Sequence, residues 1–195
     1  MADKPFQMRR LDMPRLLAVA VKDAEENTKA LLEGVQKKLG MAPNLFRTLA
    51  NSQAALEGYL KFEGALATGG LDRKVREQIA LAVAQANECQ YCLSAHTLLG
   101  KSAGLGEAEL RDSRSGASAD PKLDAMLRFA LSVVERKGGV SDADLARVRE
   151  AGVSDAEIVE IVAHVALNIL TNYINLVAQT EVDFPKVELT LASAA

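Results

Sequence analysis

The sequence predicts an all-α protein, and its composition and periodicity both support that class. The 195 residues include no tryptophan, are rich in alanine and leucine, and contain no proline from Asn44 to Asp120. Such a composition favours helices over strands. Apolar residues also recur at three- and four-residue spacing, as on the buried face of a helix. With 49% hydrophobic and 25% charged residues, residues 1–195 are predicted to form a single domain with a substantial core.

The first predicted helices lie before the middle of the chain. Apolar residues at positions 31, 32, 35 and 39 predict a helix that stops at Gly40. Pro43 is suited to the first position of a short helix that runs through Leu49. A further apolar pattern over residues 56–66 predicts a helix that ends at the glycine pair Gly69-Gly70.

A helical hairpin is predicted in the middle of the chain. Asp72 can cap a helix that runs to about Asn87, and its apolar middle, residues 79–84, is expected to be buried on every side. A second helix is predicted from about Gln90 to Ala103, before the glycines at 104 and 106, and a short helix from Glu107 to Arg111.

Residues typical of turns and helix caps divide the last third of the chain into predicted helices. Residues 113–121 are small and polar and end in Asp-Pro, which predicts a linker between two halves of one core. An amphipathic helix follows over residues 123–134. The sequence Gly-Val-Ser-Asp-Ala then occurs twice, and each copy is interpreted as a helix cap. The capping pairs are Ser141 with Asp144 and Ser154 with Glu157.

The last predicted helix, about Asp155 to Gln179, is mostly apolar but carries one polar stripe. The stripe consists of His164, Asn168, Asn172, Asn175 and Gln179. Amides form good hydrogen bonds but are poor acids and bases, so we interpret the stripe as a polar seam between helices or a subunit contact. His164 is therefore only a reserve candidate for catalysis.

Charge and hydropathy exclude several classes of function. A net charge of −3 and a pI near 5.5 argue against a nucleic-acid partner, because binding phosphates needs clustered lysine and arginine. No apolar run reaches the roughly 20 residues of a membrane span. The N-terminal residues show no adequate apolar region of a signal peptide. A soluble cytoplasmic protein with no membrane partner is expected.

Both cysteines and one of the two histidines lie in the run Glu88 to His96. On a helix, Cys89 and Cys92 stand one turn apart, and Cys92 shares a face with His96. His96 could take the proton of the Cys92 thiol, because only the thiolate reacts with a peroxide. Cys89 could then capture a sulfenic acid on Cys92 as a disulfide, and a dithiol reductant would close the cycle. No cofactor is needed.

The residues alone leave the attacking cysteine open. His96 favours Cys92, whereas Cys89 lies nearer the helix N-terminus, where the helix dipole also favours a thiolate. Glu77 lies on the preceding helix and is an ordinary surface residue unless the hairpin brings it to Cys92 and His96. In that position its carboxylate would suit proton transfer.

Two other interpretations of this run remain open. A zinc site could use both cysteines and His96 with Glu77 or His164, but structural zinc usually draws on a second ligand pair, which the chain lacks. The cysteines could also be inert core residues. We predict a redox site without a metal ion.

The motif resembles that of the AhpD-like alkylhydroperoxidases in the carboxymuconolactone decarboxylase superfamily. The resemblance covers Arg76-Glu77 and the run from Asn87 to His96, and the segments 43–47 and 181–185 resemble flanking signatures of a peroxidase-related branch. Residues 40–185 would then form the family-like core, after an extended segment 1–24 and before a tail 186–195. The resemblance implies an AhpD-like helical bundle with the C-x-x-C motif at the start of a helix.

The resemblance also implies a mechanism. Cys92 would attack the peroxide, Cys89 would resolve it, and Glu77 with His96 would relay protons in a homo-oligomer, often a trimer or hexamer. The best-known family member has a histidine where this chain has Tyr91, so tyrosine is only a possible auxiliary group. The expected function is a thiol peroxidase for hydrogen peroxide or small organic hydroperoxides, with a lipoyl-bearing or thioredoxin-like electron donor. The alternatives are a protein disulfide reductase or electron-transfer adaptor, and a lactone decarboxylase-like enzyme or non-enzymatic oligomer.

Overall fold

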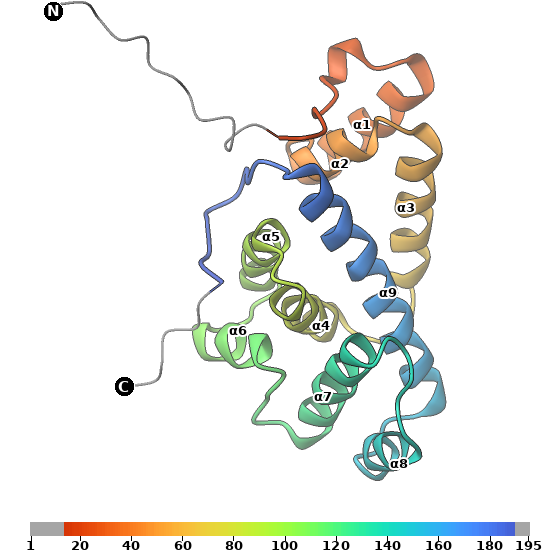
Figure 1. The fold of residues 1–195 in the computed structure, drawn as a ribbon, viewed down its shortest axis with the longest axis vertical. Coiled ribbons are helices and arrows are strands. Elements are labelled where there is room, and N and C mark those ends of the chain that lie inside the picture. Colours follow the sequence, from red (N-terminus) through yellow and green to blue (C-terminus); the bar gives the residue numbers. More distant parts are fainter. Residues whose placement is uncertain (1–13, 190–195) are drawn as a thin grey trace, which may run out of the picture.

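The computed structural model describes residues 14–189, and every regular element in that range is helical (Figure 1). This confirms the predicted all-α class. The elements are a short 3-10 helix η1 (Val21–Asp23) and the α-helices α1 (Glu26–Leu39), α2 (Asn44–Leu49), α3 (Gln53–Leu66), α4 (Arg73–Ala86), α5 (Gln90–Ser102), α6 (Glu107–Arg114), α7 (Pro121–Glu135), α8 (Asp142–Glu150) and α9 (Asp155–Ala178). The predicted N-terminal segment 1–24 and tail 186–195 lie partly outside the described residues.

Helix α4 is the centre of the molecule. It contacts α5, α6, α7 and α9, and the six side chains from Ile79 to Ala84 are all at most 2% exposed. A helix that is apolar all round is stable in water only when neighbours cover every face, as they do here. The predicted hairpin is formed by α4 and α5, which pack against each other directly.

The longest helix, α9, runs diagonally across the molecule from α8 to α2 (Figure 1). It contacts α4 and α5 as well as α2, α3 and α7. By length and composition α9 could cross a membrane, but 50% of its most apolar stretch is buried inside the fold. Such burial is typical of the core helix of a soluble helical domain.

The apolar core consists of two clusters. One lies around α2, α3 and α5 and includes Cys89, Tyr91 and Cys92. The other joins α7, α8 and the first half of α9 to α4. The C-terminal residues up to Leu189 pack against the first cluster, and Val187 accepts from Gln90 and donates to Ser94 on α5. The thiol pair is therefore part of the core.

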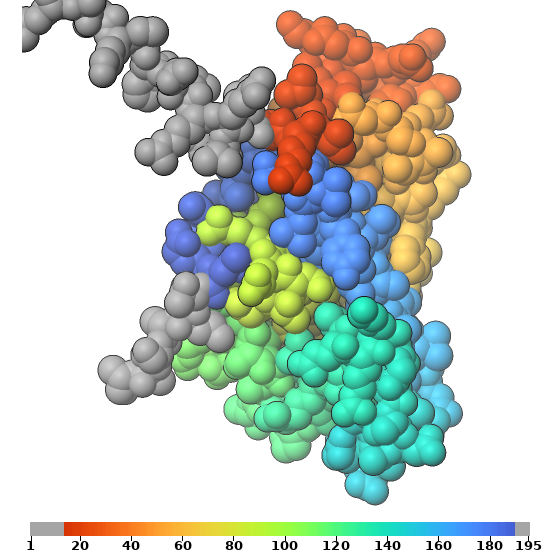
Figure 2. All heavy atoms as spheres, in the orientation of Figure 1, coloured from red at the N-terminus to blue at the C-terminus, as the bar shows by residue number. Residues whose placement is uncertain are grey.

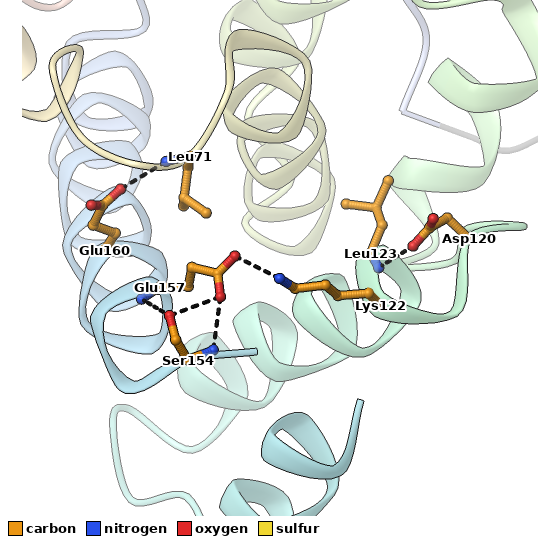
Figure 3. Close-up of polar contacts among 7 residues, drawn as sticks. All are labelled: Leu71, Asp120, Lys122, Leu123, Ser154, Glu157 and Glu160. Atoms are coloured by element: carbon orange, nitrogen blue, oxygen red, sulfur yellow. Dashed lines mark hydrogen bonds and ion pairs between the residues drawn. The ribbon is translucent and has the colours of Figure 1, made fainter. Parts of the chain in front are cut away.

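The predicted caps are present at the helix starts (Figure 3). The Ser154 hydroxyl accepts from the Glu157 amide, while the Glu157 carboxylate accepts from the Ser154 amide and from Lys122 at 2.8 Å. Ser141 and Asp144 form a second capping box. Asp72 accepts from the Val75 amide at the start of α4. The caps satisfy amides that have no partner inside a helix.

Some element boundaries differ from the prediction. Pro43 is in an extended conformation and precedes α2, which begins at Asn44. Helix α6 continues to Arg114, whose guanidinium binds Gln85 on α4, so the connection to α7 is shorter than the predicted linker 113–121. Helix α7 begins at Pro121, where the missing amide hydrogen costs nothing.

Candidate active site

A two-residue turn joins α4 to α5, the two helices of the hairpin. The Cys89 amide donates to the Ala84 carbonyl and the Glu88 amide to that of Gln85. The backbone of Glu88 is in the left-handed conformation, with φ of 53°. The two bonds therefore form a Schellman motif, in which glutamate takes the usual place of glycine. Cys89 ends this turn and is also the N-cap residue of α5.

The two thiols meet at the start of α5. The Cys89 sulfur accepts from the Cys92 amide at 3.4 Å, and its S–H donates to the Cys92 sulfur at 2.7 Å. Both cysteines are free and buried, with exposed fractions of 1% and 2%. A disulfide has a sulfur–sulfur distance of about 2.05 Å, so oxidation of this pair needs only a small movement of the side chains.

The environment favours ionisation of Cys92 and disfavours that of Cys89. Burial raises the pKa of Cys92, but the hydrogen bond from Cys89, the charge of His96, the hydrogen bond from Asn175 and the nearby amide of Asn172 lower it to about 7. The pKa of Cys89 is raised, first by its hydrogen bond to Cys92, then by burial and by the charge on Cys92. The pair therefore loses its first proton from Cys92 and keeps the other on Cys89.

His96 and Glu77 form an ion pair beside the thiols. Nδ1 of His96 lies 2.8 Å from Oε2 of Glu77, and both side chains are partly buried. Burial lowers the pKa of His96, but the hydrogen bond to Glu77 and the negative charges of Glu77 and Cys92 raise it above its usual value. The Glu77 carboxylate and the Cys92 thiolate therefore both stabilise the protonated imidazole.

The hairpin therefore brings together four of the residues singled out from the sequence: Glu77 on α4, Cys89 before α5, and Cys92 and His96 on α5. Glu77 does meet His96, the condition on which its candidacy depended. The lowered pKa of Cys92 and the raised pKa of Cys89 favour Cys92 as the thiolate, a choice that local sequence reasoning left open. His96 affects Cys92 electrostatically while its Nδ1 is bonded to Glu77.

Two asparagines of α9 also belong to the site, and sequence reasoning missed their role. Nδ2 of Asn175 donates to the Cys92 sulfur at 3.2 Å. Oδ1 of Asn172 accepts from Nδ2 of Asn87 at 2.9 Å, and Asn172 also lies beside Cys92 and lowers its pKa. The signal was the polar stripe, whose members from His164 to Asn175 the structure buries as a seam between α9 and its neighbours, whereas Gln179 is exposed.

The other members of the stripe lie away from the sulfurs. Asn168 donates to the His164 carbonyl within α9. His164 is buried, and burial together with the charge of Arg76 lowers its pKa, so its imidazole is neutral. Gln179 is the left-handed residue that ends α9.

Tyr91 is placed to hold the site together. Its hydroxyl accepts from the Leu45 amide at 3.0 Å, and its ring packs edge-on against Phe184. Burial raises the pKa of Tyr91, which keeps the phenol neutral. Asp183 accepts from the Asn44 amide at 2.7 Å, so the segments 43–47 and 181–185 meet at the start of α2.

Tyr59 of α3 is a second phenol near the site that the sequence did not mark. Burial raises its pKa, and the nearby charges of Glu63, Cys92 and Glu77 raise it further, so the hydroxyl stays protonated. Its ring packs edge-on against Phe46 at 5.7 Å between centroids.

Within residues 14–189, the structure contains no group of three or more histidine, cysteine, aspartate or glutamate side chains placed to hold a metal ion. The pairing of His96 with Glu77 and of the two sulfurs with each other suits proton and electron transfer. The arrangement can supply a nucleophilic thiolate, a proton donor and a resolving thiol.

Comparison with known proteins supports one family. Residues 53–136 match the profile of the carboxymuconolactone decarboxylase family. An uncharacterized peroxidase-related protein from Ralstonia eutropha JMP134, described as an alkylhydroperoxidase AhpD core, is 28% identical with a TM-score of 0.77, over 88% of this chain and 93% of that chain. A peroxidase-related protein from Silicibacter sp. TM1040 is 27% identical with a TM-score of 0.75, over 86% and 91%.

The fold also extends to a different chemistry. A debrominase whose structure was solved with 2,3,4-tribromopyrrole is 17% identical with a TM-score of 0.73, over 90% of this chain and 93% of that chain. At that identity the likeness concerns the fold alone. No curated protein matches the sequence.

Proposed function

Because the family match and the structural likeness place this chain in the AhpD/carboxymuconolactone decarboxylase superfamily, we propose that it is a thiol-dependent peroxidase. Its substrates are hydrogen peroxide or small organic hydroperoxides. The observation that carries the proposal is the buried thiol pair, in which the Cys92 pKa is lowered to about 7 while that of Cys89 is raised. Such a pair holds one nucleophile and one resolving thiol ready at neutral pH.

The first step oxidises Cys92. Its thiolate donates an electron pair to the hydrogen-bearing oxygen of the hydroperoxide, a sulfur–oxygen bond forms and the oxygen–oxygen bond breaks. The alkoxide, or hydroxide from hydrogen peroxide, takes the proton of the His96 imidazolium and leaves as an alcohol or water. Glu77 stabilises the imidazolium before the transfer, because its carboxylate accepts from Nδ1.

The second step resolves the sulfenic acid. The Cys89 sulfur attacks the Cys92 sulfur, a disulfide forms, and the hydroxyl leaves with the Cys89 proton as water. The starting hydrogen bond of 2.7 Å between the sulfurs supports this step. A lipoyl-bearing or thioredoxin-like dithiol then reduces the disulfide and becomes oxidised itself. Such donors are kept reduced in the cytoplasm, where we propose that the protein acts.

Mass spectrometry after peroxide treatment tests the proposal. The wild-type protein is expected to form a Cys89–Cys92 disulfide with one equivalent of hydroperoxide. A Cys89→Ser variant should accumulate sulfenic acid on Cys92, trapped by dimedone, whereas Cys92→Ser should form neither product. Absence of both the disulfide and the trapped sulfenic acid would contradict the proposal.

A steady-state assay separates a peroxidase from the alternative functions. The reduced protein is offered tert-butyl hydroperoxide or a protein disulfide, with dihydrolipoamide or thioredoxin as the donor. Turnover with the hydroperoxide is expected. Turnover with the protein disulfide alone would indicate a disulfide reductase. A Cys89→Ser, Cys92→Ser double variant with full activity on any substrate would show that the thiols are incidental.

We also propose that the protein forms a homo-oligomer through the outer face of α9. From Ile161 to Ala178 this helix has no carboxylate, lysine or arginine, yet it reaches the surface between residues 14–24 and α7 (Figure 2). The large apolar side chains exposed in this stretch are Val162, Leu170, Tyr173, Leu176 and Val177, and Val159 is exposed just before it. A stripe of this length on a helix already half buried suits a second copy of the chain.

Light scattering after size-exclusion chromatography tests this interface. The wild type is expected to be a trimer or hexamer, and Tyr173→Glu with Val177→Glu should yield smaller species. Leu39→Glu, at another partly exposed apolar residue, is the control and should leave the mass unchanged. A monomeric wild type would contradict the proposal.

A further inference from the structure

Two amide side chains beside Cys92 are buried to an unusual degree. Asn172 is 0% exposed and Asn175 is 3% exposed. Each is held in orientation by one hydrogen bond at one end of its amide. Asn175 donates from Nδ2 to the Cys92 sulfur, and Asn172 accepts through Oδ1 from Asn87. Their other ends therefore point in defined directions.

Those other ends carry one acceptor and one donor without a partner. Oδ1 of Asn175 and Nδ2 of Asn172 are both buried, and neither has a hydrogen-bond partner among residues 14–189. A buried polar group left unpaired costs about 1–3 kcal/mol. The fold thus keeps a free acceptor and a free donor next to its most acidic thiol, and a ligand that pairs with both would offset that cost.

A hydroperoxide has the complementary groups. Its O–H is a donor and its second oxygen is an acceptor. Because Cys92 is only 2% exposed, a substrate that reaches the sulfur leaves bulk water and depends on the protein for hydrogen bonds. We propose that Asn175 and Asn172 form the hydroperoxide-binding subsite, in which Oδ1 of Asn175 accepts from the peroxide O–H and Nδ2 of Asn172 donates to the second oxygen.

This assignment rests on the proposed peroxidase function and gives each amide a role in its first step. Nδ2 and Oδ1 of Asn175 share one carbon, so an O–H held by Oδ1 places its oxygen beside the sulfur that Nδ2 contacts. Asn172 donates to the oxygen that becomes the leaving alkoxide as the oxygen–oxygen bond breaks. A donor aimed at developing negative charge stabilises the transition state more than the bound substrate.

The test compares two reagents that attack the same sulfur. One is tert-butyl hydroperoxide, and the other is methyl methanethiosulfonate, a small neutral thiol reagent without a hydrogen-bond donor. Rates are measured on a Cys89→Ser background across pH and fitted for the limiting rate of the full thiolate. This removes the effect of a changed Cys92 pKa from the comparison.

The variants are Asn175→Leu and Asn172→Leu, which keep the approximate side-chain volume. Each is expected to lower the limiting hydroperoxide rate by about tenfold or more, as expected from the loss of one hydrogen bond in a buried site, while the methanethiosulfonate rate changes little. Asn168→Leu is the matched control, because Asn168 lies on the same buried stripe but bonds within α9. It should change neither rate. Asn175→Ser and Asn172→Ser repeat the test with smaller side chains if a leucine variant fails to fold.

The outcomes separate this inference from the proposed function. The subsite would be overturned, and the peroxidase left intact, by either of two results. One is a parallel loss of both rates in the variants. The other is an unchanged hydroperoxide rate in the variants, when the wild type itself reacts rapidly with hydroperoxide. A wild-type thiolate that reacts with hydroperoxide no faster than free cysteine thiolate would overturn both. A selective loss with hydroperoxide in Asn175 and Asn172 variants alone supports the subsite.

Discussion

Nδ1 of His96 donates a hydrogen bond of 2.8 Å to Oε2 of Glu77, which joins the two helices of the hairpin beside the thiols. The bond fixes the orientation of the imidazole. It also places a negative charge behind it, which raises the pKa of His96 despite its burial. Both the hydrogen bond and the charge favour the imidazolium, which is the form of His96 that can donate a proton.

Removal of this pair should slow oxidation of Cys92. His96→Ala is expected to lower the rate with hydrogen peroxide on the order of 10²-fold, the contribution of a positioned general acid or base. Glu77→Gln should lower it less, because the amide can still hydrogen-bond but carries no charge. Stopped-flow measurement of sulfenic acid formation checks both. Thr97→Ala, on the same helix, is the control and should leave the rate unchanged. Unchanged rates in the two site variants would show that His96 and Glu77 do not relay protons.

The pH dependence of Cys92 reactivity should follow its lowered pKa. The thiolate is the reactive form, so the alkylation rate is expected to rise with pH through a midpoint at about 7 and then level off. Cys89→Ala removes the sulfhydryl donor, so the midpoint should move up towards about 8.5, the value of a free thiol. Alkylation by iodoacetamide from pH 5 to 10 measures both midpoints. A higher midpoint in the wild type than in the variant would contradict the role of Cys89.

Tyr91 is expected to act on stability and not on the rate. Tyr91→Phe removes the oxygen that accepts from the Leu45 amide and leaves a buried amide unpaired, at a cost of about 1–3 kcal/mol. Urea denaturation should show this loss, while Cys92 oxidation stays nearly unchanged. Phe62→Leu, at an exposed ring on α3, should change neither quantity. A large loss of rate at unchanged stability would make Tyr91 a catalytic group.

A substitution in the turn before Cys89 should stabilise the protein. Glu88 is exposed and left-handed, a conformation that costs about 1–2 kcal/mol for a residue other than glycine. Glu88→Gly is expected to raise the free energy of unfolding by about 0.5–1 kcal/mol, after the entropy cost of glycine. Glu33→Gly, inside α1, should lower it by about 1 kcal/mol. Urea denaturation measures the change in the free energy of unfolding for both variants. Destabilisation by Glu88→Gly would show that the left-handed backbone of Glu88 carries no strain.

Most helix boundaries could be predicted because their causes are local. Asp72, Ser141 and Ser154 cap the first turns that follow them, and Gly40 ends the helix before it. The spacing of Cys92 and His96 on one helix follows from the same short-range geometry. The turn between α4 and α5 was harder to predict, because its left-handed residue is Glu88 and not glycine.

The sequence by itself determined the all-α class and the candidate set of Cys89, Cys92 and His96, because helix periodicity, caps and motif spacing act over a few residues. The contact of Glu77 with His96 depended on the packing of α4 against α5. Tertiary structure decided which groups surround the thiols. Asn175 reaches Cys92 across 83 positions, and packing of α9 against the hairpin turned a polar stripe into part of the site. A stripe on a single helix shows which side chains share a face. What that face meets depends on burial of the whole core.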